Sequence, residues 1–90
     1  MKADKQKIVR LLKTARGQID GVLKMIDEDQ YCIDIANQIL AAEAVLKKAN
    51  REVLKAHLEG CVTDVLENGD EQARAKKVEE FVTVIEKISK

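Results

Sequence analysis

The sequence predicts an all-helical protein made of three helices. Its 90 residues contain no proline, 4 glycines, one tyrosine and one phenylalanine, a composition typical of long helices when Lys, Glu, Ala, Leu and Ile dominate. Apolar residues recur in steps of three and four, the period of an amphipathic helix. We expect a single domain spanning residues 1–90. Because a chain this short buries only about 60% of its unfolded surface, a metal ion or partner subunits are expected to stabilise it.

The first helix is expected from about Asp4 to Ile26. One apolar stripe follows it, made of Ile8, Leu12, Ala15, Ile19, Val22, Leu23 and Ile26. Gly17 and Gly21 interrupt the helix, each at a cost of about 1 kcal/mol relative to alanine. They lie one turn apart, which indicates either close approach of another backbone or simple tolerance of two glycines.

The second helix is expected from about Gln30 to Glu67, after a short turn in which Asp29 is a plausible N-cap. Its first clear stop is the pair Asn68-Gly69, a good left-handed cap. Such a helix is about 57 Å long, so the first helix can cover only part of its apolar surface. A partner chain must cover the rest, which predicts an oligomer.

A third helix is expected from about Glu71 to Ile88. Its apolar stripe consists of Val78, Phe81, Val82, Ile85 and Ile88. The stripe has the same three-and-four spacing, which predicts that this helix also packs through one face.

Charge and hydropathy narrow the classes of function. The chain carries 16 basic and 16 acidic side chains, which argues against a general polyanion binder. Residues 1–24 nevertheless carry a net charge of +5, so the first helix can present a basic face to phosphate; an ordinary solvated face explains the same pattern. No apolar run approaches the roughly 20 residues that span a bilayer, and the start lacks a signal-peptide core. We therefore expect a cytoplasmic protein without membrane contact.

Two cysteines and one histidine all fall on the second helix. His57 and Cys61 are four residues apart and hence side by side. Cys32 comes 25 residues before His57, nearly seven whole turns, so it points to the same side but about 38 Å away along the axis. One straight helix cannot bring the three together. Two antiparallel copies can, and two-fold symmetry then gives two identical sites, each with Cys32 from one chain and His57 and Cys61 from the other.

Two thiolates and one imidazole favour Cu(I), because soft sulfur ligands select that ion. A structural zinc site normally has four ligands, and a fourth is not evident. Nickel or cobalt would favour more nitrogen and oxygen, but His57 is the only histidine. The alternative is that both cysteines are small buried apolar residues and His57 is solvated. The sequence shows no set of nucleophile, base and orienting group, so an enzyme is not expected.

Four segments together resemble the CsoR/RcnR family of bacterial metal-sensing repressors, and its copper-sensing branch most closely. They are residues 13–21 (KTARGQIDG), 31–32 (YC), 49–51 (ANR) and 57–61 (HLEGC). The resemblance covers nearly the whole chain. It implies a three-helix protomer, an antiparallel four-helix bundle in the dimer and a dimer of dimers. It also implies that Cys32 of one protomer and His57 and Cys61 of the other hold Cu(I) in trigonal geometry.

The resemblance also places a tyrosine and a glutamate behind the ligating histidine. Tyr31 matches the first and Glu80 the second, although the alignment needs a small insertion near residues 69–77 and leaves Glu79 as an alternative. An acceptor behind a ligating histidine fixes its tautomer and orientation. The competing interpretation is an ordinary half-buried tyrosine and a solvated acid.

Double-stranded operator DNA is the partner that the resemblance implies, held by basic residues on the first two helices. The candidates are Arg10, Lys13, Arg16, Lys48 and Arg51. The chain departs from the family at Leu11, where many members are basic. Because Arg10 precedes it here, either the DNA contact has moved by one residue or operator preference differs.

The resulting expectation is a Cu(I)-responsive transcriptional repressor. It binds its operator without copper and leaves it when Cu(I) binds, which derepresses copper efflux or resistance genes. One alternative is a persulfide-responsive repressor of the same family that bridges Cys32 and Cys61 through sulfur, although that chemistry needs no imidazole. Another is a copper-buffering protein without a DNA role, against which the basic first helix argues.

Overall fold

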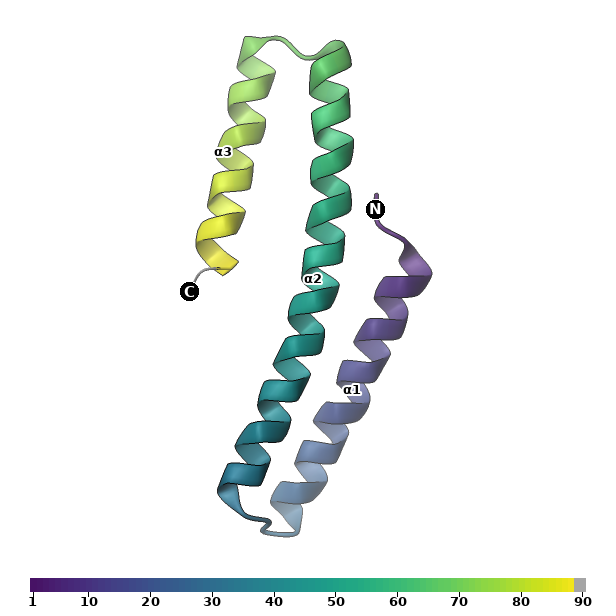
Figure 1. Ribbon diagram of the computed structural model, residues 1–90, viewed down its shortest axis with the longest axis vertical. Coiled ribbons are helices and arrows are strands. Elements are labelled where there is room, and N and C mark those ends of the chain that lie inside the picture. The colour runs from purple at the N-terminus through teal and green to yellow at the C-terminus, as the bar shows by residue number, and fades with distance from the viewer. Residues whose placement is uncertain (89–90) are drawn as a thin grey trace.

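The computed structural model describes residues 1–88, and these form three helices. They are α1 (Lys5–Asp27), α2 (Cys32–Asn68) and α3 (Glu71–Ile88) (Figure 1). The all-helical prediction is confirmed, and each helix begins and ends within two residues of its expected bounds. No strand occurs within residues 1–88.

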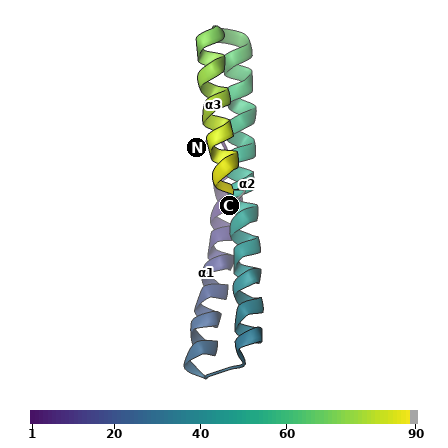
Figure 2. The same cartoon turned by 90° about the vertical axis from the view of Figure 1, so that its left-hand side faces the viewer.

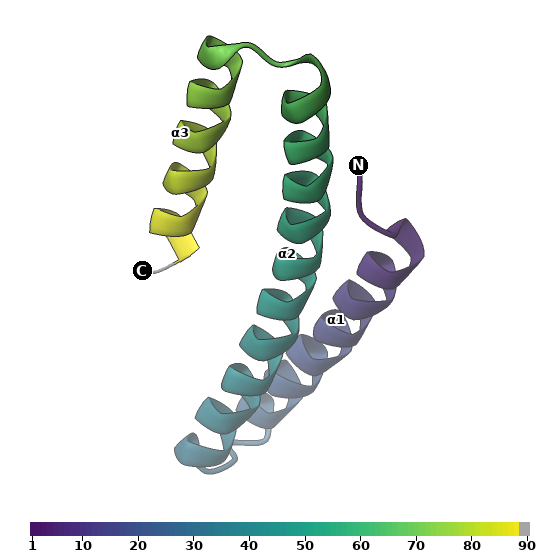
Figure 3. The ribbon, with the colours of Figure 1, turned by 45° about the horizontal axis from the view of Figure 1, so that its top comes forward.

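The long helix α2 is at the centre of the molecule. Helix α1 lies along its first half and α3 along its second half. Figures 1 and 3 show α1 and α3 on opposite flanks of α2. Packing between α1 and α2 is extensive, α3 meets α2 at few positions, and α1 and α3 do not meet within the described chain. The molecule measures 58 × 28 × 12 Å and is a thin, elongated layer, seen on edge in Figure 2. A layer this thin leaves two broad faces uncovered.

The helix α1 begins after an N-cap, Asp4. The Asp4 carboxylate accepts hydrogen bonds from the backbone N–H groups of Gln6 and Lys7, at 3.0 and 3.3 Å. These groups have no partner within the helix, so the cap stabilises the first turn.

The predicted N-cap of α2 is wrong. Asp29 has a left-handed backbone with φ 51°, and its N–H donates to the Ile26 carbonyl at 3.0 Å. Asp29 thus helps to close the end of α1, a position that aspartate tolerates better than most residues. The N-cap of α2 is Tyr31, whose side chain makes no capping hydrogen bond.

The predicted left-handed cap at the end of α2 is also wrong. Gly69 is extended, with φ −86° and ψ 141°. Only Gly69 and Asp70 link α2 to α3, and Asp70 already caps α3 by accepting from the Ala73 N–H at 2.8 Å. Glycine is required here for space instead, because a Cβ would lie 2.6 Å from the carbonyl oxygen of Val65.

The buried core is confined to the contact between α1 and α2. It consists of Ile8, Ala15 and Val22 on α1 and Ala42 and Ala49 on α2. On each helix these residues are seven positions apart, which places them on one seam, and the alanines allow the helices to approach closely. No described residue of α3 is buried.

Much of the predicted α1 stripe faces away from α2. Leu12 and Ile19 are each 45% exposed and Leu23 is 59% exposed. Gly17 and Gly21 have nothing within 4 Å of an added Cβ, so none of residues 1–88 makes the close backbone approach.

The exposed surface is too large for a compact monomer. It measures 7186 Å², against about 5,300 Å² for a folded monomer of this mass. Large apolar side chains are exposed on all three helices, so the uncovered faces are suited to packing against another molecule. None of the helices, as far as they are described, has an apolar stretch long enough to span a membrane.

Candidate metal centre

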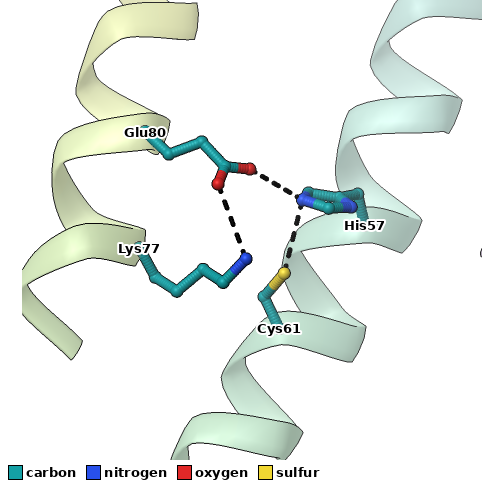
Figure 4. Close-up of polar contacts among 4 residues, drawn as sticks. All are labelled: His57, Cys61, Lys77 and Glu80. Carbon is teal, nitrogen blue, oxygen red and sulfur yellow. Dashed lines mark hydrogen bonds and ion pairs between the residues drawn. The ribbon is translucent and has the colours of Figure 1, made fainter. Parts of the chain in front are cut away.

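A histidine and a cysteine lie side by side on the second half of α2. The Sγ of Cys61 is 3.3 Å from Nε2 of His57 (Figure 4). Their spacing of four residues produces this contact, because residues one helical turn apart share a face. The His57 side chain is 48% exposed, so a nitrogen and a sulfur donor are both accessible at one surface.

Glu80 reaches this pair from α3. Its Oε1 lies 2.9 Å from Nε2 of His57, across the space between the two helices (Figure 4). A carboxylate can only accept, so the hydrogen of a neutral imidazole must be on Nε2. The hydrogen bond with His57, followed by the positive charge of Lys77, lowers the pKa of the Glu80 carboxyl below its ordinary value. Glu80 is therefore ionised at neutral pH, and it is Glu80 that contacts the histidine.

Lys77 is a fourth member of this group, which the sequence analysis missed. Its Nζ lies 3.5 Å from Oε2 of Glu80 (Figure 4). The sequence signal was present, because opposite charges three residues apart on a helix commonly pair. Several such pairs occur in the chain, however, and the sequence does not say which one faces α2.

Cys32 and Tyr31 lie at the opposite end of α2. Both are exposed, Tyr31 by 66%. Along α2, Cys32 is about 38 Å from His57. No group of three His, Cys, Asp or Glu side chains within residues 1–88 is arranged to hold a metal ion. A single chain therefore brings His57, Cys61 and Glu80 together but not Cys32 or Tyr31.

A groove of about 650 Å³ runs between the second half of α2 and α3. His57, Cys61, Lys77 and Glu80 all border it, and most of its other lining residues are apolar. The polar group therefore lies beside an apolar surface that a further helix could cover.

The five candidate DNA-binding residues lie on the other half of the molecule or near its middle. Arg10, Lys13, Arg16, Lys48 and Arg51 are all exposed, and none forms an ion pair within the described chain. The ion pair between Lys7 Nζ and Glu52 Oε1, at 3.3 Å, marks the antiparallel register of α1 and α2. Arg10 is therefore level with Ala49, between Lys48 and Arg51.

Comparisons with a family model and with known proteins both indicate metal-sensing transcriptional repressors. Residues 4–87 match the family model described as "Metal-sensitive transcriptional repressor". The copper-sensing transcriptional repressor CsoR of Mycobacterium tuberculosis is 37% identical over 83 residues, which cover 92% of this chain and 67% of that protein.

Among the solved structures similar to this chain, two cover all or nearly all of it. The copper-sensing repressor CsoR with Cu(I) from Geobacillus thermodenitrificans has a TM-score of 0.81 and 31% identity, covering 100% of this chain and 94% of that one. The nickel-responsive transcriptional regulator InrS has a TM-score of 0.79 and 28% identity, covering 92% and 94%. The fold is thus shared by sensors of different metals.

Proposed function

The chain belongs to the metal-sensitive transcriptional repressor family, and we propose that it is a Cu(I)-responsive repressor acting in the cytoplasm. It binds operator DNA through a single domain of residues 1–90, and Cu(I) releases it. Genes for copper efflux or resistance are then expressed. The observation that carries this proposal is the 3.3 Å contact of His57 and Cys61, a nitrogen and a sulfur donor on one face of α2. The chain is also similar to copper-sensing repressors of two bacteria. The family consists of repressors, not enzymes.

The donor atoms fit Cu(I) better than nickel. Cys32, His57 and Cys61 supply two thiolates and one imidazole, a soft set that selects Cu(I). Nickel is better suited by additional nitrogen or oxygen ligands, and the chain has one histidine. Similarity to a nickel-responsive regulator therefore reflects the shared fold, while these side chains favour copper.

The complete centre requires two copies of the chain. Antiparallel pairing of two α2 helices brings Cys32 of the partner subunit beside His57 and Cys61, with Tyr31 of the partner subunit next to it. The excess exposed surface supports this pairing, because about 1,900 Å² per chain above the monomer expectation is more than the roughly 800 Å² that each partner buries in a standard interface. Apolar residues on α3, such as Val78 and Val82, add a second surface suited to a dimer of dimers.

Glu80 determines which imidazole nitrogen can bind the metal. Because its carboxylate holds the hydrogen on Nε2 of His57, the lone pair of a neutral ring is on Nδ1. In this structure it is Nε2 that faces Cys61. For Nδ1 and the Cys61 sulfur to hold one metal ion, the imidazole and Glu80 would have to shift together so that the contact at Nε2 is kept, and Tyr31 of the partner subunit is a candidate to share that hydrogen.

Operator DNA is expected to lie against α1 and the middle of α2. Arg10, Lys13, Arg16, Lys48 and Arg51 are exposed and can reach phosphate or base edges. Arg51 is six residues from His57, about 9 Å along α2. A change in how α2 packs at the metal centre can therefore reach the DNA surface through one continuous helix.

Copper titration of the purified protein on operator DNA tests the proposal. We expect tight operator binding without copper and release at one Cu(I) per protomer, with zinc and nickel weaker inducers. Failure to bind any duplex from its own promoter region would favour a copper-buffering protein. Release by persulfide donors but not by Cu(I) would favour the thiol-responsive alternative.

A further inference from the structure

Lys77 ends a chain of four polar side chains that runs from α3 to α2. Its Nζ is 3.5 Å from Oε2 of Glu80, Oε1 of Glu80 is 2.9 Å from Nε2 of His57, and that nitrogen is 3.3 Å from Sγ of Cys61. Figure 4 shows the four in one group. The two oxygens of Glu80 therefore have different partners, one on its own helix and one on α2.

Packing does not fix the Glu80 carboxylate. No described residue of α3 is buried, the Glu80 side chain is 49% exposed, and the last torsion of a glutamate has a broad minimum. Lys77 is one turn away on the same helix, a spacing that lets its ammonium group reach the Glu80 carboxylate, and Nζ lies 3.5 Å from Oε2. A cation held there restricts the carboxylate and directs its second oxygen toward His57.

Lys77 contributes little to the stability of the fold. Its side chain is 47% exposed, and exposed ion pairs stabilise proteins only weakly. A variant at Lys77 should therefore fold normally, so its effect on the metal centre can be measured separately from any effect on folding.

We propose that Lys77 is a positioning residue of the metal centre: it holds Oε2 of Glu80 so that Oε1 accepts from Nε2 of His57, leaving the Nδ1 lone pair for the metal. This inference rests on the proposed function, since it assigns a role within the same centre. It adds a residue of α3 that acts on the proposed ligand His57 through Glu80.

The test is the tautomer of His57 in the protein without metal. His57 is the only histidine, so the long-range ¹H–¹⁵N spectrum contains one imidazole and needs no assignment. Spectra are recorded at about pH 8, where an ordinary imidazole is neutral, for the parent, Lys77→Met, Lys77→Arg and Glu80→Ala. Lys76→Met is the matched control, because it removes the same charge from the neighbouring residue, for which no ion pair is seen.

We expect the Nε2–H form to dominate in the parent. Its ratio to the Nδ1–H form should fall about two- to fivefold in Lys77→Met, the range of an exposed ion pair, and further in Glu80→Ala. Lys77→Arg should restore the parent ratio and Lys76→Met should leave it unchanged. Copper-dependent release of operator should weaken in Lys77→Met by a similar factor.

Two results would overturn the inference. If Lys77→Met keeps the parent ratio while Glu80→Ala lowers it, Glu80 acts without Lys77. If Glu80→Ala also keeps the ratio, the carboxylate does not select the tautomer and Lys77 has nothing to position. Failure of the proposed function is recognised separately, as a parent protein that shows the expected spectrum but keeps its operator when Cu(I) is added.

Discussion

The two halves of α2 are packed in different ways. Every buried residue of the described chain lies where the first half of α2 packs against α1: Ile8, Ala15 and Val22 on α1, and Ala42 and Ala49 on α2. The second half faces α3, which has no buried residue and is linked to α2 by the hydrogen bond between His57 and Glu80. One half is held by close apolar packing, whereas the other borders an open, mostly apolar groove that the hydrogen bond between His57 and Glu80 crosses.

This difference matches the two tasks of a ligand-responsive repressor. The basic side chains belong to the well-packed half and its margin, where a fixed helix pair can present them to DNA. The candidate metal donors and Glu80 belong to the loosely packed half, where small energies can change the packing. Regions that move in switching are commonly those with few buried contacts.

The largest expected effect is the loss of copper binding on removal of a thiol. Cys61→Ala and Cys32→Ala should each lower Cu(I) affinity by several orders of magnitude, because each removes a sulfur donor from a three-ligand site. Competition with a Cu(I) chelator measures this. X-ray absorption of the parent should show a three-coordinate, sulfur-rich ion; a site of four nitrogen or oxygen neighbours would contradict the assignment.

Glu80→Ala should separate metal sensing from DNA binding. Operator affinity without copper should be unchanged, while copper becomes a poorer inducer by about 1–3 kcal/mol of coupling, because the imidazole loses its acceptor. Operator affinity with and without Cu(I) gives this coupling. The matched control is Glu79→Ala, which removes the neighbouring acid. An equal loss of coupling in that variant would mean that the 2.9 Å contact between Glu80 and His57 does not explain the effect.

The difference in packing predicts that an alanine-to-leucine substitution lowers the free energy of unfolding more between α1 and α2 than on α3. Ala15→Leu enlarges a side chain that is 1% exposed between α1 and α2, so it should lower the free energy of unfolding by about 1–3 kcal/mol. Ala75→Leu makes the same change at an exposed position of α3 and should alter it by less than about 0.5 kcal/mol. Chemical denaturation measures the free energy of unfolding of both variants. Equal losses would contradict the claim that the two halves of α2 are packed differently.

The helices could be predicted from sequence, but their caps could not. Apolar spacing gave the bounds of α1, α2 and α3 within two residues, because periodicity reports burial over many positions. Asp29 and Gly69 were misjudged because the backbone at each depends on its neighbours: Asp29 closes α1, and Gly69 leaves room beside Val65.

The candidate site could be predicted in part. The spacing of four residues between His57 and Cys61 predicts that their side chains are neighbours on one helical face. The 25 residues between Cys32 and His57 predict that Cys32 lies far from both. The choice between Glu79 and Glu80 depends on how α3 is rotated against α2, which adjacent acids in a sequence do not reveal. Lys77 was missed for the same reason.

The smallest expected effect concerns one DNA contact. Arg51→Ala should weaken operator binding about tenfold or less and reduce the salt dependence of log K by about 0.9, the contribution of one phosphate contact. Copper binding should be unchanged, because the guanidinium is not a ligand. Fluorescence anisotropy at several salt concentrations measures both quantities, and normal binding throughout would mean that the DNA surface lies elsewhere.

The central claim is that two chains share each metal centre, and complementation of two inactive variants tests it most directly. Cys32→Ala protein and His57→Ala/Cys61→Ala protein are each expected to bind no Cu(I) tightly. Refolded together, they should form mixed dimers with one intact site, made of Cys32 from one chain and His57 and Cys61 from the other. If the mixed dimers form and bind no more copper than either variant alone, the shared antiparallel site is wrong.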